Sequence, residues 1–171
     1  MSFIKITPSD HIQGNAEAPI ELVEYGDYQC SYCGQAYYIV KNLQRKLGKD
    51  LKFVFRNYPL EELHPNAMHA AIAAETAAEM GKFWEMHDIL FENQRRLDDS
   101  SLIHYAQKIG LDVNLFEKEF GSSAIVEKVK YDIDSGNKNG VSGTPSFFVN
   151  GKFFDGNWTG PEFLKYLKSL I

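Results

Sequence analysis

The stretch that decides the fold is residues 21–42, which read ELVEYGDYQCSYCGQAYYIVKN. It contains both cysteines of the chain, Cys30 and Cys33, in a C-x-x-C spacing. An apolar, β-prone segment (residues 20–25) precedes them, and a helix-prone segment (residues 34–47) follows them. A C-x-x-C pair at a predicted strand-to-helix junction is typical of redox chemistry, because the N-terminal end of a helix favours a thiolate.

The closeness of the two cysteines argues against a purely structural disulfide. A disulfide stabilises a protein mainly by restricting its unfolded chain, and a small loop gives little restriction. Redox chemistry is therefore the better reason for a bond between Cys30 and Cys33. We expect Cys30, at the start of the helix, to be the more exposed nucleophile, and Cys33, one turn further, to be the shielded resolving thiol.

The residues between the cysteines, Ser31 and Tyr32, carry no charge. Activation of Cys30 is then left to the helix end and to local hydrogen bonds, so we expect its pKa to fall only moderately. Tyr32 is a candidate for an apolar rim that contacts unfolded substrates.

Glu24 interrupts the apolar strand six residues before Cys30. A carboxylate on a strand that is covered on both faces loses its hydration, and burial raises its pKa. We expect Glu24 to relay a proton to or from Cys33. The alternative is that Glu24 lies on an edge strand and faces solvent.

A second loop, Gly-Thr-Pro at residues 143–145, stands directly before a predicted strand at residues 146–149. Pro145 is at a position where a cis peptide bond can form the turn. A cis proline there would leave the backbone of Thr144 unpaired and facing outward. That backbone could pair with an extended substrate segment as an added strand.

Composition bounds the class of protein. The 171 residues, 44% hydrophobic and 24% charged, fit one globular domain or one domain with an inserted sub-domain. The net charge of −5 argues against a nucleic-acid partner. No apolar stretch approaches the roughly 18 residues of a spanning helix.

Residues 1–10 lack the apolar core of a secretion signal. The sequence as written therefore predicts a cytoplasmic protein. The alternative is an extracytoplasmic or periplasmic protein whose signal is not part of this chain.

Hydrophobic periodicity predicts an alternation of strands and helices. Strands are expected at residues 3–6, 20–25, 51–55, 146–149 and 152–154, the last two as a hairpin around Asn-Gly. Residues 7–19 are expected to be a loop. Five helices are expected within residues 65–139, the fourth of them capped by Asp112. Thr159 and Glu162 predict a capping box at the start of a last helix.

Three local signatures resemble those of one known family. They are EYGDYQCSYC at residues 24–33, HPNAMHAAIAAETAAEMGKFWEMHDILF at residues 64–91 and GVSGTPSFFVNG at residues 140–151. From about residue 20 to the end, the chain resembles the DsbA-like thiol–disulfide oxidoreductases of the thioredoxin superfamily. The resemblance implies an α/β thioredoxin fold with an inserted all-helical sub-domain: a core made of residues 1–60 and 140–171, interrupted by the insertion at residues 61–139.

The resemblance also implies roles for individual residues. In that family the first cysteine attacks, the second resolves, an acidic residue lies beneath the pair and the loop proline is cis; these roles fall to Cys30, Cys33, Glu24 and Pro145. The implied partners are protein or peptide thiols and disulfides, together with a redox protein that recycles the site, and no added cofactor. Tyr32 stands where the best-known periplasmic members have histidine, which argues against strong-oxidant character. Oxidase, reductase and isomerase share these residues, so the direction of electron flow stays open.

Two other classes of function compete with this interpretation. Cys30, Cys33, His64 and His69 loosely copy the ligand pattern of a zinc site, although the gap between the pairs is long. Alternatively, the chain is a redox-inactive thioredoxin-fold module that binds a partner, for example to regulate a transporter.

Overall fold

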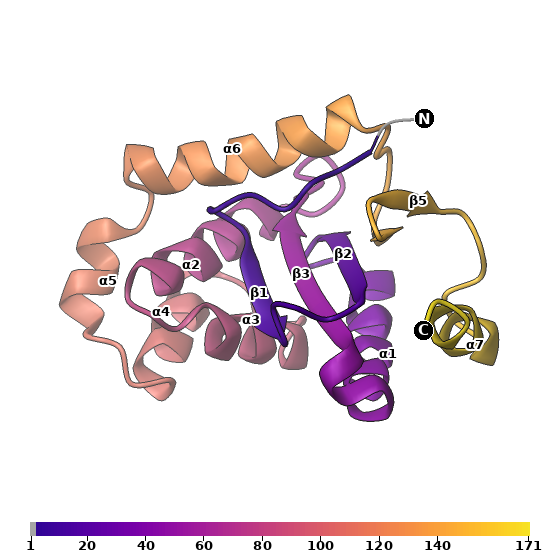
Figure 1. Cartoon of the computed structure of the whole chain (residues 1–171). Coiled ribbons are helices and arrows are strands. Elements are labelled where there is room, and N and C mark those ends of the chain that lie inside the picture. Colours follow the sequence, from indigo (N-terminus) through magenta and orange to yellow (C-terminus); the bar gives the residue numbers. More distant parts are fainter. Residues whose placement is uncertain (1–2) are drawn as a thin grey trace.

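The computed structural model describes residues 3–171. Its elements in chain order are β1 (His11–Gly14), β2 (Ile20–Gly26), α1 (Ser31–Leu47), a 3-10 turn (Gly48–Asp50), β3 (Leu51–Asn57), α2 (Ala67–Glu79), α3 (Phe83–Glu92), α4 (Asp99–Lys108), α5 (Val113–Glu119), α6 (Ser123–Lys138), β4 (Ser146–Val149), β5 (Lys152–Phe154) and α7 (Pro161–Lys168). The predicted helical block is confirmed, because α2 to α6 lie between β3 and β4 in the chain (Figure 1).

The strands form one mixed sheet with the order β1-β3-β2-β4-β5. β2 and β3 are parallel, and the other neighbours are antiparallel. β2 is therefore a central strand, and all of its residues except Glu21 are buried. Figure 1 shows α6 on one side of the sheet and α1 on the other. This two-sided cover explains why β2 is apolar along nearly its whole length.

α1 begins at Ser31, three residues before the predicted start at residue 34. Cys30 is its N-cap residue in an extended conformation, and the carbonyl oxygen of Cys30 accepts the first helical hydrogen bond from Gly34 at 3.0 Å. Gly48, with φ of 52°, ends the helix as the sequence predicted. The earlier start places both cysteines at the N-terminal end of the helix.

The N-terminal segment differs from the prediction. Residues 3–6 form no strand, although Ile4 is buried and its N–H donates to Gly151 at 3.0 Å. The strand β1 lies instead within the predicted loop at residues 7–19, and it pairs antiparallel with β3. Its inward residues are the polar His11 and Gln13, while Ile12 is exposed, so hydrophobicity gave no sign of it.

The predicted capping box at the last helix is wrong. Gly160 is the N-cap of α7, which starts at Pro161. The N–H and hydroxyl of Thr159 both donate to Asn157 Oδ1, at 2.9 and 2.6 Å. Asparagine readily forms such a local turn, and proline is favoured at the first helical position, so together they displace the cap by one residue.

Two other local predictions are confirmed. Asp112 caps α5 by accepting the N–H of Leu115 at 3.0 Å. β4 and β5 form the expected hairpin, in which Asn150 and Gly151 have φ of 47° and 83°. Both signals depend on neighbours within a few residues, which is why the sequence alone was sufficient.

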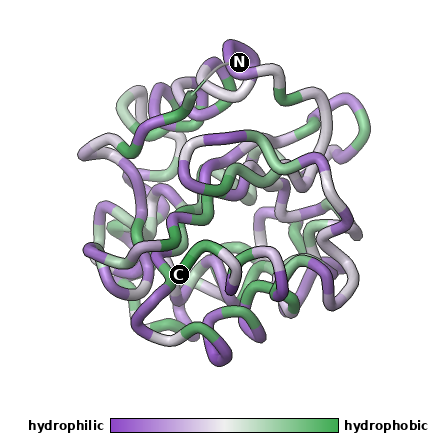
Figure 2. The backbone as a smooth tube through the Cα atoms, turned by 45° about the vertical axis from the view of Figure 1, so that its right-hand side comes forward, coloured by the Kyte–Doolittle hydropathy of each residue, from purple (hydrophilic) through white to green (hydrophobic). Residues whose placement is uncertain are grey.

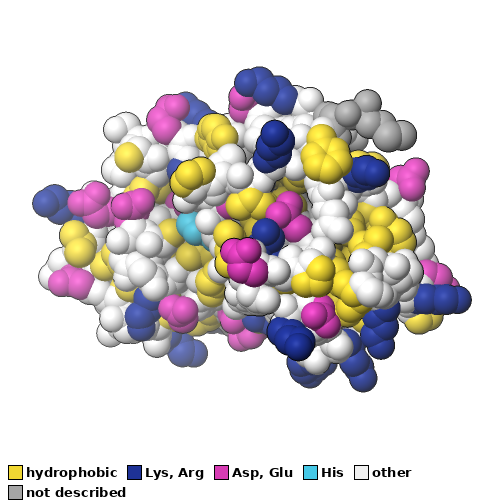
Figure 3. Space-filling view, in the orientation of Figure 1, with side chains coloured by type: hydrophobic (Ala, Val, Ile, Leu, Met, Phe, Trp, Pro, Cys, Tyr) yellow, Lys and Arg dark blue, Asp and Glu magenta, His cyan; other side chains and the backbone are white. Residues whose placement is uncertain are grey.

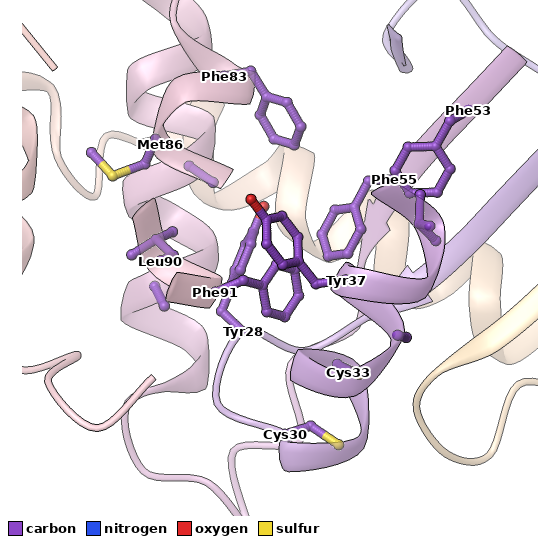
Figure 4. Close-up of a cluster of buried hydrophobic side chains, with 14 of the residues drawn as sticks. Tyr28, Cys30, Cys33, Tyr37, Phe53, Phe55, Phe83, Met86, Leu90 and Phe91 are labelled. Atoms are coloured by element: carbon purple, nitrogen blue, oxygen red, sulfur yellow. The ribbon is translucent and has the colours of Figure 1, made fainter. Parts of the chain in front are cut away.

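A single large hydrophobic cluster joins the sheet, α1 and the inserted helices. In Figure 4, the rings of Tyr28, Tyr37, Phe55 and Phe91 lie between α1 and α3, close to the end of α1 that carries Cys30. Figure 2 shows hydrophobic segments alternating with hydrophilic ones along the backbone. The insertion and the core thus share one interior.

One face of the molecule carries side chains of mixed charge. On the face drawn in Figure 3, acidic and basic side chains are interspersed with hydrophobic ones. Across residues 3–171, no helix has the length and apolar character needed to cross a membrane.

Candidate active site

The two cysteines are free thiols at the N-terminal end of α1. Sγ of Cys30 donates to the carbonyl oxygen of Thr144 at 3.7 Å, and Sγ of Cys33 accepts the N–H of Asp27 at 3.4 Å. Cys30 is 6% exposed and Cys33 is fully buried. The structure thus places Cys30 nearer the solvent and Cys33 behind it.

The surroundings separate the pKa values of the two thiols. The pKa of Cys30 is lowered to about 5, first by a hydrogen bond from the Cys33 side chain, and also by the Thr144 side chain and the N–H groups of Cys33 and Tyr32; burial opposes this. Burial raises the pKa of Cys33 well above its usual value, and the hydrogen bond to Cys30 and the charge of Glu24 raise it further. At neutral pH, Cys30 is then a thiolate and Cys33 a thiol that supports it.

Glu24 lies on the central strand and is only 1% exposed, so the alternative of a solvent-facing edge residue is wrong. Its Oε1 atom is buried without a hydrogen-bond partner in residues 3–171. Burial, and then the charge of Cys30, raises the pKa of Glu24 to about 8. A glycine at position 26 leaves space here, because a Cβ on Gly26 would lie 3.0 Å from Oε1 and still closer to the Phe55 ring. A largely protonated acid near neutral pH is thus buried within electrostatic reach of both cysteines.

The bond between Thr144 and Pro145 is cis. The carbonyl oxygen of Thr144 faces Cys30, and within residues 3–171 its N–H makes no backbone hydrogen bond. The Thr144 hydroxyl is buried and makes no hydrogen bond within residues 3–171 when both cysteines are thiols. It is therefore available to donate to a thiolate at Cys30. The loop therefore presents the carbonyl oxygen and the hydroxyl of Thr144 to the sulfur of Cys30. It also leaves the N–H of Thr144 free beside Cys30.

Asp27 is a site residue that the sequence analysis missed. Its carboxylate is buried and accepts three hydrogen bonds, from the N–H of Gln29 at 2.7 Å, the N–H of Leu60 at 3.0 Å and Nδ1 of His64 at 2.7 Å. These contacts fix the turn whose own N–H reaches Cys33. An aspartate directly after a strand is a turn signal, but two of its three partners, Leu60 and His64, lie more than thirty residues away.

Gln94 is a second missed residue, and it comes from the inserted block. Nε2 of Gln94 donates to the carbonyl oxygens of Tyr28 at 2.9 Å and Cys30 at 2.8 Å. A Cβ on Gly34 would overlap Oε1 of Gln94, so glycine permits this approach. The insertion thereby holds the backbone of the nucleophile.

Two further predictions from the sequence concern Tyr32 and the alternative zinc site. Tyr32 is 64% exposed beside Cys30, as a contact for a substrate requires. The four residues of the zinc alternative are not gathered into one site: His64 pairs with Asp27, and His69 pairs with Asp99. Over residues 3–171 no group of three or more His, Cys, Asp and Glu side chains is placed to hold a metal ion.

Comparisons with known proteins agree with this geometry. A family model described as thioredoxin matches residues 6–169. A thioredoxin-like oxidoreductase from Silicibacter pomeroyi is 25% identical with a TM-score of 0.83, and the match covers 95% of this chain and 92% of that one. The thiol-disulfide exchange protein alpha-DsbA2 from Wolbachia pipientis is 20% identical with a TM-score of 0.82, and the match covers 96% and 88%.

Curated relatives at higher identity have a different name. The Na(+)/H(+) antiporter NhaA 1 of Salinispora arenicola is 41% identical over 149 residues, which is 87% of this chain but 23% of the antiporter. This chain therefore spans about a quarter of the length of the curated relatives it matches.

The chain belongs to the thioredoxin family, and its fold is that of the DsbA-like thiol–disulfide oxidoreductases.

Proposed function

We propose that this chain exchanges disulfides with protein substrates, with Cys30 as the attacking sulfur and Cys33 as the resolving one. The observation that carries the proposal is the opposite shift of the two pKa values at one helix end, down for Cys30 and up for Cys33. A thiolate is the nucleophile of disulfide exchange and also its better leaving group. The arrangement directs both roles to Cys30.

Written in the oxidising direction, the exchange has two steps. A substrate thiolate attacks Sγ of Cys30 in the Cys30–Cys33 disulfide, and Cys33 leaves as a thiolate that takes up a proton. A second substrate thiolate then attacks the substrate sulfur of the mixed disulfide, and Cys30 leaves as its stabilised thiolate. The substrate loses two electrons and gains a disulfide, while the protein gains two electrons. The reverse sequence reduces a substrate disulfide, and a redox partner protein resets the site in either direction.

Glu24 supplies the proton that Cys33 needs as it leaves. The proposal is supported by its burial, its raised pKa and its influence on the pKa of Cys33. Replacing Glu24 by Gln should slow the step in which Cys33 leaves and flatten its pH dependence between pH 6 and about 8. An unchanged rate and an unchanged pH profile would exclude the relay.

The direction of electron flow follows from the redox potential. A lower pKa of the nucleophile stabilises the reduced form and makes the disulfide more oxidising. The value of about 5 for Cys30 lies between about 7 for thioredoxin and about 3.5 for DsbA. We expect equilibration with glutathione to give a potential between about −270 and −120 mV; a value outside this interval would contradict the argument.

The decisive test is exchange itself. Reduction of insulin and oxidation of a dithiol peptide should both proceed with the wild type and be lost in Cys30→Ser, while Cys33→Ser should accumulate the mixed disulfide. If the wild type catalyses neither reaction, the proposal is wrong.

A second candidate is the redox-inactive binding module, and the antiporter relatives favour it. In those proteins, the matched region is one part of a chain that is about four times as long as the match. A thioredoxin-fold region in that setting could regulate transport by binding rather than by exchange. Absence of insulin and peptide activity in the wild type would favour this candidate.

A further inference from the structure

A groove of about 530 Å³ lies next to the nucleophile, between the first half of α1 and the segment that joins α3 to α4. Ser31, Gln35 and Tyr38 line it from α1, and Gln94, Arg95 and Arg96 line it from the insertion. Tyr38 is 61% exposed, so its ring is open to a ligand.

The groove is continuous with the reaction centre. Ser31 directly follows Cys30, and Gln94 donates to the carbonyl oxygen of Cys30 at 2.8 Å. Thr144 contacts the sulfur of the same residue. An extended segment bound along Thr144 and linked through sulfur to Cys30 has its next residues within reach of the groove.

The charges of the groove wall are uneven. Arg95 and Arg96 are exposed, and neither makes an ion pair with any other residue between 3 and 171. The nearby acidic side chains all have partners: Glu92 accepts the Tyr37 hydroxyl at 2.8 Å, Asp98 accepts the hydroxyls of Ser100 and Ser101, and Asp99 pairs with His69. None of these carboxylates, of which only Glu92 lines the groove, forms an ion pair with Arg95 or Arg96, so both guanidinium groups are free to bind an incoming segment beside the nucleophile.

We propose that this groove binds the part of a protein substrate that flanks its reactive cysteine, and that Arg95 and Arg96 select segments with acidic side chains. Arginine suits this task because its planar fork pairs with carboxylates in two-point contacts. Tyr38 contributes an apolar contact for the stem of the same segment. The proposal rests on the exchange function and adds a substrate class to it.

The test uses three dithiol peptides that differ only at the two positions after the reactive cysteine, where they carry Glu, Gln or Lys. The oxidised protein should oxidise the Glu peptide about three- to tenfold faster than the Lys peptide at low salt, with Gln between them. The difference should shrink as ionic strength rises, because exposed charges are screened.

Two variants and a control assign the effect to the groove. Arg95→Glu combined with Arg96→Glu should reverse the order, and the corresponding pair of Gln substitutions should abolish it. Arg45→Glu combined with Lys46→Glu makes the same change of charge at the far end of α1, about 20 Å from Cys30, and should keep the wild-type order. Circular dichroism checks that each variant is folded.

The outcomes separate the two proposals. Equal rates for the three peptides with an active wild type would overturn the groove and leave the exchange function intact. The same would follow if the double Glu variant kept its preference for acidic peptides. Failure of the wild type to oxidise any peptide would overturn both.

Discussion

The Cys33 side chain is the largest influence that lowers the pKa of Cys30. Cys33→Ala removes this hydrogen-bond donor, and hydrogen bonds to charged groups contribute about 1.5–3 kcal/mol. The pKa of Cys30 should therefore rise by about 1–2 units in Cys33→Ala. Cys33→Ser keeps a donor at the same place and should leave the pKa close to the wild-type value. Ultraviolet absorbance of the thiolate measures both, and identical curves for the two variants would show that the helix end and the Thr144 loop are sufficient.

Glu24 should make the stability of the oxidised protein depend on pH. Burial is the first cause that raises the pKa of Glu24 above 4.5, and burial persists in the disulfide form, so the folded state keeps a proton that the unfolded state loses. Stability is then highest below pH 4.5 and falls as pH rises toward 8, by at most about 1.4 kcal/mol per pH unit. Glu24→Gln should remove this slope in urea unfolding experiments.

The redox state of the protein provides the control for that experiment. In the reduced protein, Cys30 has a lowered pKa, so its contribution to stability grows as pH rises above about 5 and opposes the effect of Glu24. The disulfide form lacks this titration, and the effect of Glu24 stands alone there. A wild-type oxidised protein whose stability does not change with pH would contradict the raised pKa.

At the residue scale, the sequence predicted those parts of the site that are marked by spacing within the chain. Cys30 and Cys33 follow from the C-x-x-C spacing, and Glu24 from a charge within an apolar strand. Asp27 and Gln94 were not predicted, because their roles depend on hydrogen bonds to residues that lie 33 to 66 positions away in the chain. A glutamine in a polar loop has no sequence feature that distinguishes it from any other surface residue.

At the scale of elements, Gly34 and Gln94 connect α1 to the inserted helices. Gly34→Ala should push the Gln94 amide away from the carbonyl oxygens of Tyr28 and Cys30, at a cost of about 1–2 kcal/mol in stability. Two hydrogen bonds are lost, although the carbonyl oxygen of Cys30 keeps the N–H of Gly34 as a donor. Gln94→Ala should have a similar cost for the same reason.

A double-mutant cycle in urea checks this mechanism. If Gly34→Ala acts by displacing Gln94, the two substitutions together should cost clearly less than the sum of the two alone. Additive effects would mean that the methyl group disturbs α1 directly, without involving Gln94.

Elements with a periodic or local signal could be predicted, and those defined by distant partners could not. The five inserted helices and the β4–β5 hairpin follow from spacing and turn residues. β1 could not be recognised, because it is stabilised by pairing with β3, by stacking of His11 on Phe83 at 3.7 Å and by Glu75 at 2.9 Å. These partners lie far along the chain, and they contact the inward-facing side chains of the polar strand β1.

At the scale of the whole molecule, the predicted insertion (residues 61–139) and the rest of the chain share a hydrophobic core. The main hydrophobic cluster includes Phe53 of the sheet, Phe91 of α3 and Phe163 of α7. A buried network adds polar links, in which Asn57 at the end of β3 contacts Glu75 of α2 and Asp132 of α6. Because the main cluster and this network are shared by the two parts, we expect them to unfold together.

The two tryptophans can test this expectation because each reports on one part. Trp84 lies in α3 of the insertion, where its indole N–H donates to Ile12, and Trp158 precedes α7 and packs on Phe147. Trp84→Phe leaves Trp158 as the reporter, and Trp158→Phe leaves Trp84. Urea unfolding followed by fluorescence should have its midpoint, in each variant, at the same urea concentration as the circular dichroism of that variant. Fluorescence and circular dichroism midpoints that differ within one variant would show that the insertion is an independent folding unit, and the shared cluster would then be an interface between two domains.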